Sequence, residues 1–113
     1  RRLDLGVAPF LTLPAEALQG LQSVDSPPAR WWLIENRASF EKQAARRVPG
    51  DALVWIAGRP TRAWSEAMAR LIALAPAPAA ISADADPAGI EIALVAAGPW
   101  EQAGLRWAAT AMA

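Results

Sequence analysis

Three short apolar runs, separated by segments with helical spacing, constrain the fold of this 113-residue chain most strongly. The runs are Trp31–Ile34, Ala52–Ala57 and Ala79–Ala83, and each ends abruptly at charged or turn-forming residues. Nearly continuous apolar runs of this kind are typical of strands that are buried on both faces of a parallel sheet. The alternation of strands and helices, without hairpin signals, therefore predicts an α/β fold with a mostly parallel open sheet and helices on both faces.

The segments that follow these runs carry helix signals. A first helix is expected from about 39 to 47, and a second begins after Thr61, which is a good N-cap residue. The apolar residues of the second helix recur at helical spacing: Trp64, Met68, Leu71, Ile72 and Ala75. A third helix is expected over Pro87–Ala97, because Gly98-Pro99 should stop it, and a final strand around 105–107.

The first 28 residues are less regular, and Ser26-Pro27-Pro28 separates them from the alternating pattern. We therefore expect a lead-in segment over 1–28 and one domain over 29–113. Because the chain lacks an initiator Met, we expect a fragment of a longer protein whose upstream domain the lead-in segment joins. No apolar run is long enough for a transmembrane span or a secretory signal, so we expect a cytoplasmic protein with no membrane partner.

The residue types that are missing exclude several kinds of chemistry. The sequence has no Cys, no His and no Tyr, which excludes disulfides, thiolate nucleophiles, histidine catalysis and the usual zinc sites within it. Eleven basic and eleven acidic residues give a formal net charge of zero. The domain therefore has no broad positive field for nucleic acid, and a local cluster or a neighbouring domain would have to supply most of any DNA affinity.

Carboxylates follow two of the predicted strands. Asp84 and Asp86 come after the third apolar run, and Glu35 follows the first. The carboxyl ends of parallel strands share one edge of the sheet, so we expect these three side chains to converge there. Carboxylate oxygens are the ligands that Mg²⁺ prefers, and Mn²⁺ is the alternative ion. A second interpretation is that Asp86 only caps the next helix, with Pro87 at the first helical position.

The order and spacing of these residues resemble the Toprim domain. Asp84–Ile92 is similar to the Asp-x-Asp-Pro-x-Gly motif of the topoisomerase VI A subunit and its relatives. Ile34–Phe40 and Gly58-Arg59-Pro60 resemble still more closely the C-terminal Toprim domain of the Wadjet nuclease subunits (JetD). The resemblance covers roughly 30–97, and Asn36, where many Toprim enzymes have Gly, favours the topoisomerase VI and Wadjet branch.

The resemblance implies a Mg²⁺-dependent DNA endonuclease domain in a Wadjet-type anti-plasmid defence system. Asp84 and Asp86 would hold the ion, and Glu35 would complete the metal shell or act as a general acid or base. DNA and condensin-like subunits would be the partners, and a homodimer is left open. Four basic residues flank the motifs and would grip DNA phosphates, unless they are ordinary surface charge: Arg37, Lys42, Arg59 and Arg62.

Two other functions stay open from the sequence. The first alternative is a non-catalytic Toprim scaffold that binds DNA or a partner subunit, which the lack of excess positive charge allows. The second is a topoisomerase VI-like transesterase whose nucleophilic Tyr lies outside this sequence. The side chain of Asn36 either orients Glu35 or caps the helix that follows.

Overall fold

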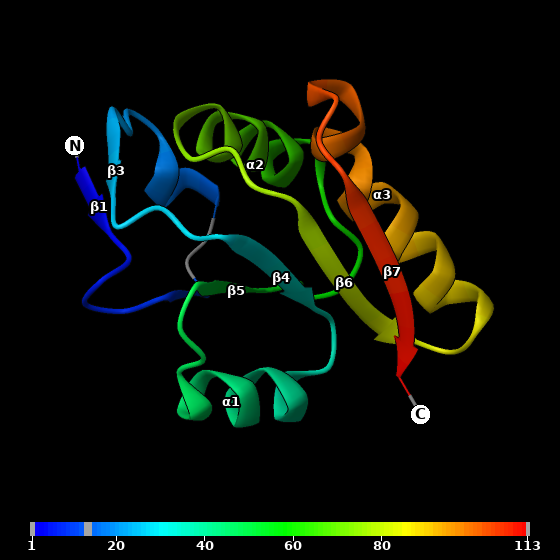
Figure 1. The fold of residues 1–113 in the computed structure, drawn as a ribbon. Coiled ribbons are helices and arrows are strands. Elements are labelled where there is room, and N and C mark those ends of the chain that lie inside the picture. The colour runs from blue at the N-terminus through cyan, green and yellow to red at the C-terminus, as the bar shows by residue number, and fades with distance from the viewer. Residues whose placement is uncertain (1, 13–14, 113) are drawn as a thin grey trace.

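A five-stranded parallel sheet forms the centre of the molecule (Figure 1). The computed structural model describes residues 2–12 and 15–112. In spatial order the strands are β2 (Phe10–Leu11), β5 (Asp51–Trp55), β4 (Arg30–Ile34), β6 (Ala79–Asp84) and β7 (Trp107–Met112). Every neighbouring pair is parallel. The predicted α/β class with a parallel open sheet is confirmed, and the three apolar runs form β4, β5 and β6.

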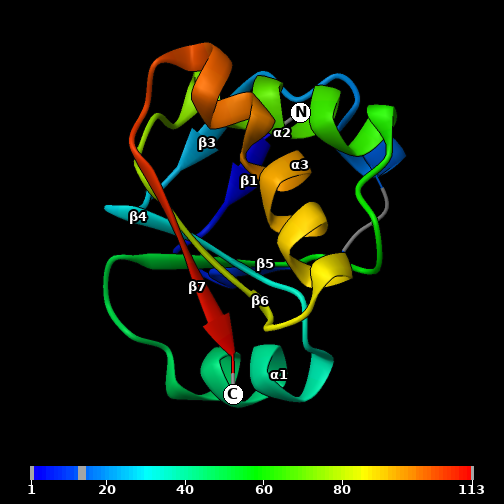
Figure 2. The ribbon, with the colours of Figure 1, turned by 90° about the vertical axis from the view of Figure 1, so that its right-hand side faces the viewer.

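Helices cover both faces of this sheet, as predicted (Figures 1 and 2). Helix α1 (Arg37–Arg46) lies on one face, while α2 (Arg62–Leu74) and α3 (Pro87–Ala103) pack together on the other. Side chains alternate along each strand, so neighbouring residues of β4 enter different parts of the core. Leu33 belongs to the large cluster beneath α2 and α3, whereas Ile34 packs with Phe40 of α1.

Two buried tryptophans fix the connection between α2 and β6. The indole N–H of Trp31 donates to the carbonyl of Ala75 at 3.0 Å, and that of Trp100 donates to the carbonyl of Ala77 at 3.0 Å. Both side chains are fully buried. An indole buried with its N–H paired combines a large apolar contact with a satisfied donor. These contacts hold the residues just before β6 in place, and β6 ends at Asp84.

The first 28 residues contribute a strand to the sheet, which the sequence did not predict. β2 lies beside β5, where the Leu53 N–H donates to the carbonyl of Pro9 at 2.8 Å. A second small sheet pairs β1 (Arg2–Asp4) with β3 (Ser23–Asp25), and a short 3₁₀ helix, η1 (Ala15–Leu18), lies between them in sequence. A strand of two residues is too short to leave an alternating pattern.

The prediction that the third helix ends at Ala97 is wrong. α3 continues through Gly98-Pro99 to Ala103 and ends at Gly104, whose φ of 70° suits glycine. Pro99 and Trp100 are both buried, so tertiary packing outweighs the loss of one helical hydrogen bond at the proline. The last strand, expected around 105–107, is present as β7 but covers Trp107–Met112. Across the described residues, no helix combines the length and the apolar character that crossing a membrane demands.

Candidate functional site

The carboxyl ends of β4 and β6 form the point where the chain changes direction across the sheet. β4 and β6 are neighbours, with Ile34 paired to Ser82. After β4 the chain enters α1 on one face, and after β6 it enters α3 on the opposite face (Figure 2). Ligands of open α/β sheets bind in the crevice at such a switch point. Glu35, Asp84 and Asp86 all lie there.

Glu35 is held in place by three hydrogen bonds. Its backbone N–H donates to the Ser82 carbonyl at 3.0 Å, and its own carbonyl accepts from the Trp55 indole at 3.0 Å. Its carboxylate oxygen Oε1 accepts from the backbone N–H of Asp84 at 2.8 Å. The structure thus brings the end of the first predicted strand against the end of the third. Trp55 helps to position Glu35 through this hydrogen bond, which the sequence analysis missed because a tryptophan inside an apolar run is usually a core residue.

Asp86 is the N-cap of α3, as the alternative interpretation expected. Its Oδ1 accepts from the Gly89 N–H at 2.6 Å, and Pro87 occupies the first turn. Its own N–H donates to the Asp84 carbonyl at 2.9 Å, which closes a tight turn between the two aspartates. Capping uses one carboxylate oxygen, and Oδ2 has no hydrogen bond to any residue that the structure describes. Asn36 caps α1 in the same way, by accepting from the Ser39 N–H at 2.9 Å.

The carboxylates at this edge can supply oxygen ligands to a hard cation, but among the described residues they do not form a preformed metal site. In the part of the chain that the structure describes, no three acidic side chains are gathered closely enough to hold a metal ion. Asp84 is exposed, and its carboxylate has no hydrogen bond or ion pair among the described residues. Glu35 and Asp86 each use one carboxylate oxygen in a hydrogen bond, and the second oxygen of each has no partner within residues 2–12 and 15–112. Oxygen donors of this kind fit Mg²⁺, which is typically held by one or two carboxylates together with water and substrate phosphates.

Gly89 is a further site residue that the sequence analysis quoted without assigning a role. A Cβ at this position would overlap the carbonyl oxygen of Asp84 and lie 2.9 Å from its carbonyl carbon and 3.0 Å from its nitrogen. Glycine therefore allows the first turn of α3 to rest directly on the end of β6. The spacing of a glycine three residues after a capping aspartate is the signal that could have indicated this close approach.

Three of the four predicted DNA-binding residues are in ion pairs. Arg37 and Arg62 pair at 3.1 Å with Glu41 and Glu66, each one helical turn further on. Arg59 pairs with Glu91, which links the loop after β5 to α3 beside the site. All six side chains are at least half exposed, and exposed ion pairs contribute little stability, so a phosphate can displace the carboxylate at small cost. Lys42 is exposed and has no ion-pair partner among the described residues.

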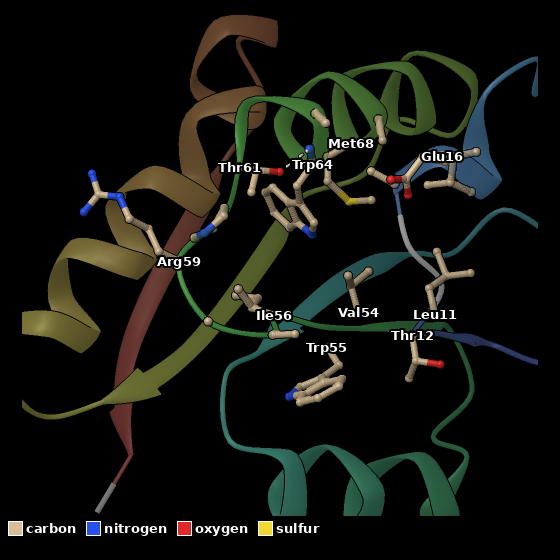
Figure 3. Close-up of a pocket in the computed structure, with 17 residues that line it drawn as sticks. Leu11, Thr12, Glu16, Val54, Trp55, Ile56, Arg59, Thr61, Trp64 and Met68 are labelled. Carbon is tan, nitrogen blue, oxygen red and sulfur yellow. Dashed lines mark hydrogen bonds between the residues drawn. The ribbon is translucent and has the colours of Figure 1, made fainter.

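A cavity of about 390 Å³ lies next to this edge rather than at the carboxylates (Figure 3). It opens between the start of α2 and the ends of β5 and β2, and Val54, Ile56, Trp64 and Met68 make its lining largely apolar. Arg59 extends from its rim toward α3. The three carboxylates do not line it. Its volume therefore bears on core packing around α2 and not on the acidic crevice.

The fold and the site define an open parallel α/β domain with acidic residues at its switch point. No protein-family model, no curated protein and no solved structure matches this chain.

Proposed function

We propose that this chain is a Toprim-type domain of a Mg²⁺-dependent DNA endonuclease that hydrolyses phosphodiesters. One observation carries the proposal: Glu35, Asp84 and Asp86 lie at the switch point between β4 and β6, and the Glu35 carboxylate accepts the Asp84 N–H. The motif from Asp84 to Gly89 is consistent with it, because Asp86 caps α3 and Gly89 allows α3 to approach the end of β6, which holds Asp84 and Asp86 at the same turn.

The hydrogen bonds of each carboxylate indicate which role it would take in the proposed reaction. Asp84, whose carboxylate has no other partner, and the free oxygen of Asp86 would bind the ion, and Glu35 would complete its shell or move a proton. A bound divalent ion would neutralise charge on the scissile phosphate and lower the pKa of bound water. The N-cap hydrogen bond orients Asp86, and the Asp84 N–H orients Glu35. Arg59 and Arg37, at the same edge, would position DNA phosphates after exchanging their carboxylate partners.

The sequence favours hydrolysis over transesterification. A topoisomerase-like reaction uses a tyrosine hydroxyl as nucleophile, and these 113 residues contain none. Such a nucleophile would have to come from another domain or subunit, whereas hydrolysis needs only water.

DNA would be held largely by partners of this domain. The formal net charge is zero, and Arg37, Arg59 and Arg62 already pair with carboxylates. Affinity for the phosphate backbone comes from basic side chains that neutralise phosphates and so release the counterions bound to the DNA. We therefore propose that condensin-like subunits of a Wadjet-type assembly present the DNA, in keeping with the sequence resemblance.

The test measures metal binding and plasmid cleavage in the protein together with its natural domains and partners. Mn²⁺ binding is followed by electron paramagnetic resonance, and cleavage by conversion of supercoiled plasmid. Asp84→Asn and Asp86→Asn should each lose metal affinity and cleavage by about tenfold or more, since each removes one charged ligand. Asn is as good an N-cap as Asp, so Asp86→Asn should leave the stability of α3 intact. Glu16→Gln is the matched control, because it removes an exposed carboxylate of η1 that does not belong to the ends of β4 and β6.

Metal binding and cleavage that survive Asp84→Asn unchanged would refute the catalytic assignment. A non-catalytic scaffold is the second candidate, and one observation favours it: no three acidic side chains are gathered for a metal among the described residues. That candidate predicts DNA or partner binding by the wild-type protein without measurable Mn²⁺ binding.

A further inference from the structure

A further cavity lies on the α1 side of the sheet, beside the acidic crevice. Its volume of about 430 Å³ is within the usual range of small-ligand sites, about 300–1,000 Å³. Three aromatic rings line it: Phe10 of β2, Phe40 of α1 and Trp55 at the end of β5. Figure 3 shows that Trp55 points to this side of β5, opposite to Val54 and Ile56. Phe40 is buried, whereas Phe10 and Trp55 are partly exposed, so the surfaces of two rings are accessible.

Two guanidinium groups lie over the accessible rings. The Cζ of Arg37 is 5.2 Å from the centre of the Trp55 ring, and Arg37 also lines the cavity. The Cζ of Arg47 is 5.9 Å from the centre of the Phe10 ring. Residues 37–47 contain four basic residues and one acidic residue, in a chain whose formal net charge is zero. The cavity therefore lies at a locally basic surface, which attracts anions.

The cavity adjoins the acidic crevice without being part of it. The Trp55 indole donates to the Glu35 carbonyl at 3.0 Å, and Arg37 begins α1 two residues after Glu35. The three carboxylates of the crevice do not line the cavity. A group bound in the cavity would thus be separated from the end of β4 by the Trp55 ring.

We propose that this aromatic cavity, defined here by Phe10, Arg37, Phe40 and Trp55, holds one unpaired base of a DNA strand. Bases of any type stack on aromatic rings, and basic side chains beside the rings neutralise the adjoining phosphates. Arg37 is placed to contact such a phosphate, because its exposed ion pair with Glu41 is weak and can be exchanged.

The combination of flat rings and basic groups selects a nucleotide as the occupant. A purely apolar peptide segment would gain nothing from the guanidinium groups of Arg37 and Arg47, and an acidic peptide would leave the ring surfaces unused. A nucleotide uses both features, since its base is flat and aromatic and its phosphate is an anion.

The cavity also restricts the form of DNA that it can accept. A base must leave the duplex stack to enter, which costs least in single-stranded, frayed or mismatched DNA. This inference rests on the proposed function for the choice of DNA as the polymer. It narrows the substrate of that function to strands with an unpaired base beside the cleaved bond.

The first experiment measures binding in EDTA, so that its result does not depend on cleavage. The protein, with its natural domains, is titrated into a fluorescent thymidine oligonucleotide or into an abasic strand of the same length, and binding is followed by anisotropy. Both strands carry the same phosphates, so a difference in affinity reports the bases. Wild type should bind the thymidine strand about tenfold more tightly or better.

Variants of the two accessible rings locate this preference. Phe10→Leu and Trp55→Leu should each reduce the preference for the thymidine strand by about threefold or more, because each removes a ring. Neither should change the affinity for the abasic strand, since no charge is lost. Trp107→Leu is the matched control: Trp107 is also partly exposed, but it lies on β7, at the opposite edge of the sheet from β2. Circular dichroism checks that the variants are folded.

A charge variant separates the phosphate contact from the base contact. Arg37→Gln should weaken binding of both strands equally and reduce the slope of log affinity against log salt concentration by about 0.7, as loss of one phosphate contact to a single strand predicts. Arg2→Gln is the matched control, because Arg2 is likewise exposed and ion-paired, with Asp25 in the small β1–β3 sheet. It should leave both affinities unchanged.

Equal affinity of wild type for the two strands would overturn the proposal, as would a preference that Phe10→Leu and Trp55→Leu both leave intact. Thymidine monophosphate that competes as strongly as the oligonucleotide would overturn the assignment to a DNA strand. A ring-dependent base preference without plasmid cleavage would support the cavity and refute the nuclease. Cleavage without the preference would do the reverse.

Discussion

Replacing Gly89 with Ala tests the contact on which the site is built. A Cβ there would overlap the Asp84 carbonyl oxygen and approach its carbon to 2.9 Å. The obstructing atoms belong to the backbone of β6, which five-stranded pairing holds in place, so they cannot move aside like the end of a flexible side chain. Either α3 must shift at its first turn or the end of β6 must distort.

The sign of the change in unfolding free energy distinguishes the effect of this contact from the effect of helix propensity. Ala is better than Gly in a helix by about 1 kcal/mol, so propensity alone predicts that Gly89→Ala stabilises the protein. Overpacking costs typically about 1–3 kcal/mol and occasionally more, and a clash with fixed backbone belongs at the upper end. We therefore expect a net loss of about 2 kcal/mol or more. For a domain whose total stability is about 5–15 kcal/mol, this is a large fraction.

The assay is urea unfolding followed by tryptophan fluorescence. With a slope of about 1–2 kcal/mol per molar urea, the midpoint should fall by about 1–2 M. Gly98→Ala in the same helix is the matched control, since a Cβ there meets nothing within 4 Å. Because Pro99 follows and restricts the preceding residue, we expect its stability to stay within about 1 kcal/mol of wild type. A Gly89→Ala protein as stable as wild type, or more stable, would refute the close-approach argument.

Two further predictions concern groups that hold the sheet. Arg30 donates to Asp51 at 2.7 and 3.0 Å, and this hydrogen bond raises the pKa of Arg30. A raised pKa gives stability that is complete below the unfolded-state pKa and is lost only at strongly alkaline pH. Because the Arg30 side chain is 43% exposed and solvent screens the pair, Arg30→Gln should cost only about 1 kcal/mol, equally from neutral to mildly alkaline pH; urea unfolding at several pH values measures this, and a cost that varies over this range would contradict the assignment. Trp100→Phe should lower thermal stability by about 2–4 kcal/mol, since it leaves the buried Ala77 carbonyl unpaired and opens a cavity. Trp107→Phe, whose indole donates to the exposed Glu101, should cost about 1 kcal/mol or less, and equal losses for the two variants would count against this reasoning.

The sequence by itself determined the order of the central elements. Three short apolar runs bounded by polar residues are typical of buried strands, and the capping residues Asn36, Thr61 and Asp86 mark where the helices begin. Since parallel strands place their carboxyl ends at one edge, the convergence of Glu35 with Asp84 followed from that order. These features depend on local residue chemistry and on the periodicity of apolar residues, and both can be recognised in the sequence.

Only the tertiary structure decided the features that depend on partners distant in sequence. β2 is a strand because β5 offers it a free edge, and α3 continues through Gly98-Pro99 because burial of Trp100 outweighs one lost helical bond. Likewise, Arg59 is paired with Glu91, 32 residues later, and the Glu35 carboxylate accepts a backbone N–H instead of standing free. Contacts of this kind arise from how the elements pack in space. No local pattern encodes them, and this is why the sequence indicated where the acidic site lies but not how its side chains are held.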